Sequence, residues 1–133
     1  MIPKFRAWHH ELGRMMSIKN MWFQEGVVEE IELNDTVMND YITSYPDEVT
    51  IMQSTGLKDK NGKEIFEGDI VQYQNTKVPS ADSKGVIRYF DNWAMFGIDI
   101  EHNEPRALFF NGLADHISLD VVGNTYENPE LLE

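Results

Sequence analysis

A group of histidines and acids near the N-terminus has side chains of the kind that bind transition metals. His9, His10 and Glu11 are consecutive, and imidazole and carboxylate groups are common zinc ligands. Neighbouring residues of a strand point to opposite faces, so these three would rarely reach one ion. His102 and Glu104 could join them only if the fold brought the two segments together. We therefore interpret the histidines as surface or loop residues and predict no metal site.

Three carboxylates form a second group beside two expected turns. Glu64, Glu67 and Asp69 are close in sequence, and general acid–base catalysis needs two carboxylates that converge on a cleft from different environments. Acidic residues at turns more commonly accept hydrogen bonds from backbone N–H groups, which is our interpretation of Glu67 and Asp69. The sequence has no nucleotide-binding loop, nucleophile elbow or zinc-protease helix. We predict no catalytic residue and no cofactor, and hence a protein that is not an enzyme.

Three lysines are the main cluster of positive charge. Together with an aromatic side chain such as Tyr73 or Trp93, Lys58, Lys60 and Lys63 could bind single-stranded nucleic acid. The chain as a whole opposes phosphate binding, because 11 lysines and arginines face 23 acids and the formal net charge is −12. Affinity for a duplex depends on cations that displace counterions. We expect no binding to duplex DNA and retain the single-stranded nucleic-acid face as an alternative.

Negative charge is concentrated in residues 20–57, which contain eight acids and no Lys, Arg or His. This segment could attract a basic host or phage protein, or it could be a solvated face that keeps the protein soluble. Mimicry of DNA is a further alternative, although it requires carboxylates spaced along a rod-like face. The acids of the segment are Glu25, Glu29, Glu30, Glu32, Asp35, Asp40, Asp47 and Glu48.

A dense apolar set in the N-terminal segment indicates self-association. Met15, Met16, Met21, Trp22 and Phe23 have few polar residues between them, and a large exposed apolar patch usually marks an interface. Because most soluble oligomers are symmetric, one patch would meet its copy in a small homo-oligomer. The alternative is that the two aromatic residues fold onto the core and complete it.

Length and composition predict a single domain over residues 1–133, with a possible subdivision into residues 1–46 and 47–133. Short apolar runs separated by turn residues predict strands at residues 49–53, 70–73, 85–90, 93–100, 106–110 and 117–122. The expected fold is mostly β: a small SH3-like barrel or a strongly bent antiparallel sheet over the C-terminal two-thirds, preceded by an irregular N-terminal segment. Asn128, Pro129 and Glu130 predict a short C-terminal helical turn.

Turn residues separate the predicted strands. Asn61 and Gly62 are typical of a type I′ turn, in which both residues have positive φ. Gly68 and Asp69 predict a second turn that begins a strand, in which Val71 and Tyr73 should point inward. A further turn is expected after residue 122, and its residues are Gly123 and Asn124.

Three blocks of the sequence together resemble the YopX family. They are Phe5-Arg6-Ala7-Trp8 with Met15 following, the segment TGLKDKNGKEIFEGDIV at residues 55–71, and VGNTYENPEL at residues 122–131. Where the family often has an acidic residue, this chain has His9. The resemblance implies a protein of phages and prophages of Gram-positive bacteria that acts in the host cytoplasm, and it supplies no catalytic residue.

These observations lead to one functional hypothesis. The sequence has no cysteine, no signal peptide and no apolar run long enough to span a membrane, so we expect a cytoplasmic protein without a membrane partner. We predict a non-enzymatic phage accessory protein that works through protein contacts, chiefly with copies of itself.

Overall fold

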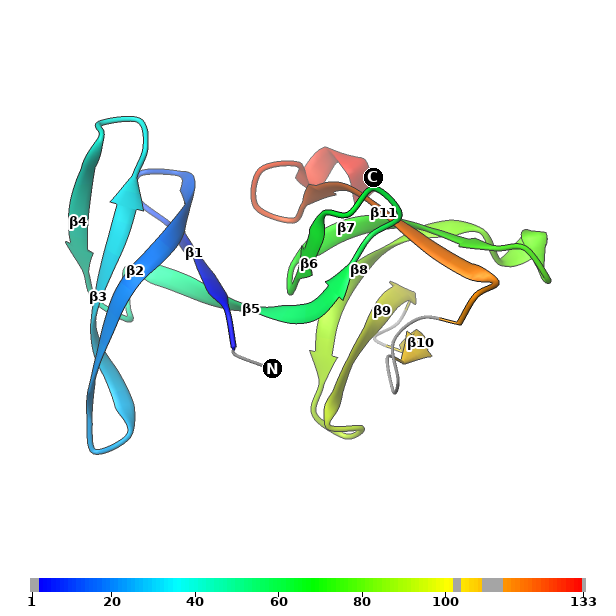
Figure 1. Cartoon of the computed structure of the whole chain (residues 1–133), viewed down its shortest axis with the longest axis horizontal. Coiled ribbons are helices and arrows are strands. Elements are labelled where there is room, and N and C mark those ends of the chain that lie inside the picture. Colours follow the sequence, from blue (N-terminus) through cyan, green and yellow to red (C-terminus); the bar gives the residue numbers. More distant parts are fainter. Residues whose placement is uncertain (1–2, 102–103, 109–113, 133) are drawn as a thin grey trace. The chain divides into compact units, whose positions relative to one another are not determined.

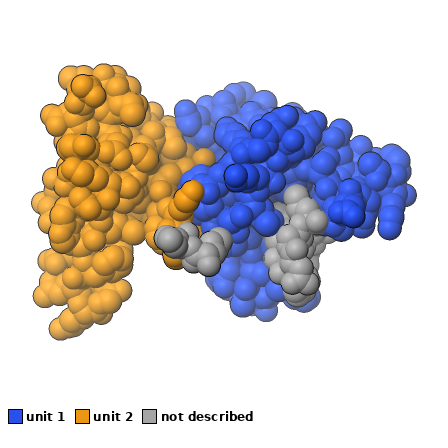
Figure 2. Space-filling model, viewed as in Figure 1, with its two compact units in different colours: residues 1, 54–133 blue, residues 2–53 orange. Residues whose placement is uncertain are grey.

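The computed structural model describes residues 3–101, 104–108 and 114–132. The chain forms two compact units: one contains residues 2–53, and the other contains residues 54–133 together with residue 1 (Figure 2). The chain passes from the N-terminal unit to the C-terminal unit within a single strand, β5, which spans Val49–Lys58.

The N-terminal unit is an antiparallel sheet. Its other strands are β1 (Phe5–His9), β2 (Arg14–Gln24), β3 (Val27–Asp35) and β4 (Asp40–Ser44). They lie in the order β4-β3-β2-β1, and the first half of β5 pairs with the free side of β1 (Figure 1). Cross-strand pairs such as Ala7 with Met16 and Ile18 with Leu33 bring apolar side chains to one face. The buried core of the unit is Ala7, Met16, Ile31, Leu33 and Val49.

The prediction that residues 1–46 form an irregular segment is therefore wrong. The strands β2 and β3 contain two register shifts, between Ile18 and Asn20 and between Trp22 and Phe23. The first shift leaves Lys19 of β2 unpaired, and the second leaves Glu29 of β3 unpaired. Each such β-bulge reverses the alternation of apolar and polar positions in its own strand. A simple period of two therefore does not reveal these strands.

The C-terminal unit begins with the second half of β5, which pairs with the short strand β6 (Glu64–Phe66). Five further strands follow: β7 (Asp69–Asn75), β8 (Ser83–Phe90), β9 (Met95–Glu101), β10 (Glu104–Leu108) and β11 (Ile117–Asn124). They form an antiparallel sheet in the order β10-β9-β8-β7-β11 (Figure 1). Two short 3₁₀ turns, Pro79–Ala81 and Pro129–Leu132, complete the described part of the unit.

The mostly β class is confirmed, but the barrel is not. Within the described strands the five-stranded sheet is open, because β10 and β11 each pair on one side only. Val71 and Tyr73 point into the core as predicted, where they pack with Ile65, Ile87 and Leu119. The predicted strands at residues 85–90 and 93–100 correspond to β8 and β9, which pair with each other. The predicted C-terminal helical turn is the 3₁₀ turn Pro129–Leu132. The predicted strand at residues 106–110 extends beyond the described residues at its end.

No helix in the part of the chain that the structure describes is both long and apolar enough to cross a membrane.

Candidate functional site

Asp59 is a buried carboxylate that joins two distant parts of the C-terminal unit. It is 7% exposed. Its Oδ1 accepts hydrogen bonds from the backbone N–H groups of Asn61 at 2.9 Å and Lys63 at 2.8 Å. Its Oδ2 accepts one from the backbone N–H of Val121, in β11, at 3.0 Å. Burial by itself raises the pKa of Asp59, but the three N–H donors and the charge of Lys63 outweigh it and lower the pKa. Both oxygens are committed to the backbone.

The turn after Asp59 differs from the predicted type I′ turn. Gly62 has φ of 83°, whereas Asn61 is not in the positive-φ region. The N–H of Gly62 donates to the carbonyl of Asp59 at 3.0 Å, and the N–H of Asp59 donates to the carbonyl of Lys63 at 2.7 Å. This is the pattern of a type I turn closed by a left-handed glycine. The Asp59 side chain selects it, because that side chain holds the N–H groups of Asn61 and Lys63.

Asp69 also has a structural role. It is 1% exposed, and its Oδ2 accepts the backbone N–H of Phe66 at 2.8 Å. The neighbouring Gly68 has φ of 85°, and its carbonyl accepts the N–H of Thr125 at 2.9 Å. Glu64 and Glu67 are half-buried. Because Asp69 is sealed inside the turn, its carboxylate is not accessible for acid–base chemistry.

The turn predicted at Gly123 and Asn124 lies just after them: both residues end β11, and the turn spans residues 125–127. The Oδ1 of Asn124 accepts the backbone N–H groups of Tyr126 at 3.0 Å and Glu127 at 2.9 Å. A side chain at Gly123 would place its Cβ 2.6 Å from the Oδ1 of Asn128. Packing against Asn128 therefore requires glycine at this position.

The histidine and glutamate side chains that the sequence offered as possible metal ligands do not form a cluster among the described residues. His9 is 5% exposed, so its interpretation as a surface residue is wrong; its Nδ1 accepts the backbone N–H of Leu12 at 3.1 Å. His10 lies 2.9 Å from the Oγ1 of Thr50, and Glu11 is exposed. His102 lies outside the described residues, and Glu104 begins β10. Among the described side chains, no group of three or more metal-binding types is placed to hold an ion.

Of the two aromatic residues suggested for the nucleic-acid face, Tyr73 is not available, whereas Trp93 is 53% exposed. Lys58, Lys60 and Lys63 are exposed around the β5–β6 turn, but Tyr73 is only 4% exposed. The Tyr73 hydroxyl accepts a hydrogen bond from Asn75 at 3.2 Å. Lys60 lies 3.8 Å from the carboxylate of Asp120. Tyr73 therefore cannot stack on a base.

The predicted apolar set divides between the core and the surface. Met16 is buried, Met21 packs against the core and Met15 is half-buried. Trp22 and Phe23 are 47% and 58% exposed.

The two exposed aromatic residues lie on a projecting hairpin, residues 20–30, which we call the β2–β3 arm. β1 pairs with β2 only at residues 14–17, and β4 pairs with β3 only at residues 31–35. Within the described chain, no third strand flanks the arm.

The tip of the arm is Glu25-Gly26, with φ of 51° and 82°, so the type I′ turn predicted at Asn61 occurs here instead. Val27, missed by sequence reasoning, is 69% exposed beside this turn. The Glu25-Gly26 pair between two apolar runs is the sequence signal that could have predicted this hairpin turn.

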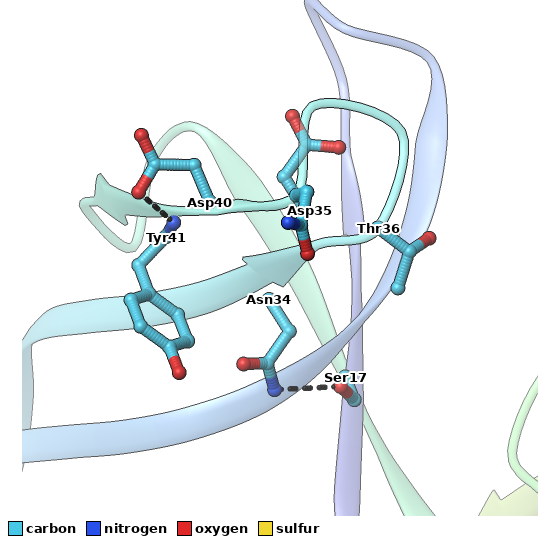
Figure 3. A pocket seen from close by; sticks show the side chains of 7 residues that line it. Ser17, Asn34, Asp35, Thr36, Asp40 and Tyr41 are labelled. Atoms are coloured by element: carbon cyan, nitrogen blue, oxygen red, sulfur yellow. Dashed lines mark hydrogen bonds between the residues drawn. The ribbon is translucent and has the colours of Figure 1, made fainter.

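A polar pocket of about 390 Å³ lies at the other end of β3. Asn34 donates a hydrogen bond to the Oγ of Ser17 at 2.8 Å, and the backbone N–H of Tyr41 donates to the Oδ1 of Asp40 at 2.7 Å (Figure 3). Sequence reasoning missed this pocket because the N-terminal segment, residues 1–46, was predicted to be irregular. The residues that line it are Ser17, Asn34, Asp35, Thr36, Asn39, Asp40 and Tyr41.

Comparison with known proteins places the chain in a family. The family model described as YopX protein matches residues 4–133. The chain belongs to the YopX family. The crystal structure of protein EF1440 from Enterococcus faecalis is similar, with 31% identity, a TM-score of 0.66 and coverage of 100% of this chain and 99% of that protein. The structure of protein yopX from Bacillus subtilis shares the fold, with 18% identity, a TM-score of 0.62 and coverage of 98% of each chain. A search of curated proteins found no match.

The resemblance to the YopX family is carried largely by residues that build turns. The central block contains Asp59, Gly62, Gly68 and Asp69, and the final block contains Asn124. Their described hydrogen bonds go to the backbone or to other residues of the same turns. The β2–β3 arm and the polar pocket lie outside these blocks. The residues that resemble the family therefore build turns, whereas the exposed groups that could contact a partner or ligand lie elsewhere.

Proposed function

We propose that this YopX-family protein is a non-enzymatic accessory protein of a phage or prophage, acting in the bacterial cytoplasm through protein contacts, and that it self-associates through the β2–β3 arm. The observation that carries the proposal is the exposure of Trp22, Phe23 and Val27 on a hairpin with no flanking strand among the described residues.

The geometry of the arm favours a contact surface. Met21 and Val28 connect the arm to the core of the N-terminal unit. A two-stranded ribbon by itself is at best marginally stable in water, so packing of the exposed residues against a partner would stabilise the arm further. Trp22 and Phe23 are adjacent in β2 and therefore point to opposite faces. The arm thus offers apolar surface on both faces, which suits insertion between elements of another molecule.

A second copy of the chain is the partner that fits this geometry. Symmetric association would bury the exposed aromatic side chains of both copies at once. The arm carries Glu25, Glu29 and Glu30 and no lysine or arginine, so two arms repel each other electrostatically. Salt screens that repulsion, and association should therefore strengthen from low to moderate ionic strength. A basic partner protein would show the opposite salt dependence.

Light scattering on a sizing column tests the proposal at tens of micromolar protein. We expect an oligomeric mass that increases with salt, and a monomeric mass for the double variant Trp22→Ser, Phe23→Ser. Val27→Glu, at a position 69% exposed, should weaken association without disturbing the core. Trp93→Ser, which changes a tryptophan 53% exposed in the C-terminal unit, is the matched control. A monomeric mass for the unaltered protein at every salt concentration would overturn self-association.

A further inference from the structure

The polar pocket contains a row of neutral side chains on neighbouring strands. Ser17 of β2 is in register with Asn34 of β3, and Asn34 is in register with Tyr41 of β4. Residues paired across strands project from the same face of a sheet. Figure 3 shows the side chains of Asn34 and Tyr41 extending to the same side, with Asn34 reaching Ser17. Three hydrogen-bonding side chains are therefore held next to one another.

The acids of the pocket are directed elsewhere. Asp35 and Asp40 are the next residues along β3 and β4 and form a cross-strand pair, so they alternate to the opposite face. In Figure 3 their carboxylates extend away from the side chains of Asn34 and Tyr41. Asp35 is 3% exposed and forms an ion pair with Arg14 at 2.7 Å. It also accepts the N–H of Val37 at 3.1 Å, which fixes the loop that forms the pocket wall.

The row retains hydrogen-bonding capacity. Asn34 uses its amide N–H₂ on Ser17, and its carbonyl oxygen has no partner among the described groups. The Tyr41 hydroxyl and the side chains of Thr36 and Asn39 likewise make no hydrogen bond within the described structure. Hydroxyl and carboxamide groups both donate and accept. The Tyr41 ring is 54% exposed and adds apolar surface.

Charge complementarity is poor for an ionic ligand. No lysine or arginine lines the pocket, so an anion would depend on Lys19, which is already engaged with another group. Lys19, two residues after Ser17 in β2, is held 3.6 Å above the Tyr41 ring and 3.5 Å from Glu32. A cation would gain only the exposed carboxylate of Asp40, and exposed ion pairs contribute little.

We propose that this pocket binds a neutral polyhydroxylated ring, that is, a pyranose sugar. Each sugar hydroxyl is both a donor and an acceptor, as are the groups of the row. The carbon face of the sugar can lie on the side of the Tyr41 ring that Lys19 does not cover. The pocket volume of about 390 Å³ is within the usual range for small-ligand sites.

Amide chemical shifts of the ¹⁵N-labelled full chain test this proposal. Titration with glucose and with N-acetylglucosamine should give saturating shifts at Ser17, Asn34, Asn39 and Tyr41, with dissociation constants of about 1–10 mM. Glucosamine and glucose 6-phosphate, which carry a charge, should bind more weakly. Asn34→Ala should weaken binding by about tenfold or more, the loss of roughly one good hydrogen bond to the ligand.

Tyr45→Ala is the control and should leave the sugar-induced shifts unchanged. Tyr45 is 51% exposed, close to the 54% of Tyr41, but it does not line the pocket. An unchanged dissociation constant in Asn34→Ala, tighter binding of either charged sugar, or no saturating shifts of the unaltered protein with either neutral sugar would each overturn the proposal. The pocket and the arm are at opposite ends of β3. Trp22→Ser should leave the sugar-induced shifts unchanged, so this proposal and the proposal of self-association can fail separately.

Discussion

The turn that follows β3 and the turn that follows β5 each contain a buried aspartate, but the two carboxylates are stabilised differently. Asp59 receives only backbone N–H groups in its described hydrogen bonds, and one of them comes from a residue 62 positions away. Asp35 receives N–H groups from its own loop and the guanidinium of Arg14, 21 positions away. Every non-proline residue has a backbone N–H. The long-range hydrogen bond at Asp59 therefore depends on one side chain, whereas the long-range hydrogen bond at Asp35 depends on two, those of Asp35 and Arg14.

The largest effect should come from removing the Asp59 carboxylate. Asp59→Ala leaves three N–H groups without their acceptor, and we expect the free energy of unfolding to fall by about 3 kcal/mol. Urea denaturation measures the loss, and hydrogen exchange at the Val121 amide reports the broken hydrogen bond directly. Asp59→Asn, which keeps one acceptor oxygen, should lose less. An unchanged rate of hydrogen exchange at the Val121 amide in Asp59→Ala would contradict the hydrogen bond from Val121 to Asp59.

Removing Arg14 should have a smaller effect. Arg14→Ala leaves Asp35 buried without its counter-charge, which is strongly destabilising for fully buried pairs. The Arg14 side chain is 28% exposed, so water replaces part of the lost interaction and we expect a loss of about 2 kcal/mol. Arg14→Lys retains the charge and should be intermediate in a urea titration. Equal stability of Arg14→Ala and the unaltered protein would show that the loop N–H groups suffice for Asp35.

The glycine that closes the Asp59 turn provides a narrower test. Gly62 has φ of 83°, and nothing lies within 4 Å of the position that a Cβ would occupy, so strain in the backbone is the main penalty for substitution. Gly62→Val should cost about 1–2 kcal/mol. Asn61→Ala should cost less, because Asn61 does not have positive φ and loses chiefly its hydrogen bond to Asp120. Thermal melts that rank the two variants in the reverse order would restore the type I′ interpretation.

Protonation of Asp59 in acid should lower the free energy of unfolding least, because a protonated carboxyl group can still accept hydrogen bonds. Its pKa in the folded protein is below the ordinary value of 3.8, so the folded state binds protons less readily than the unfolded state. The stabilisation is therefore complete well above pH 3.8 and is lost as the pH falls through the folded pKa. Comparison of urea midpoints between about pH 6 and pH 2.5 should show a smaller acid-dependent loss in Asp59→Asn than in the unaltered protein. Identical pH profiles would refute a lowered pKa at Asp59.

Local patterns in the sequence were sufficient for the β class and for much of the C-terminal unit. The alternation at Val71 and Tyr73 predicted that these two side chains enter the core, although Ile70 is buried as well. The apolar runs on either side of Asn92 predicted the strands β8 and β9. These features depend on strand geometry over a few residues. The N-terminal sheet was missed because the bulges near Asn20 and Phe23 interrupt the same alternation.

The candidate sites required more than local pattern. Sequence identified Trp22 and Phe23 as apolar residues in need of a partner, but not that they lie on a two-stranded arm beside Val27. It also grouped Lys63 with Tyr73, although Tyr73 is buried. Exposure depends on which strands flank a residue, and that information is distributed along the chain.

The sequence by itself determined the mostly β class, the principal turn positions at Gly62, Gly68 and Asn124, and the predominance of negative charge. Steric preferences of single residues and hydrogen bonds over two to five positions are enough to produce those features. Only the tertiary structure decided the conformation of the Asp59 turn and the alignment of Ser17, Asn34 and Tyr41. Asp59 bonds to a donor 62 residues away, and the pocket combines three strands through their register. Such arrangements form only when distant segments pair, because each segment alone leaves its hydrogen-bonding groups to water.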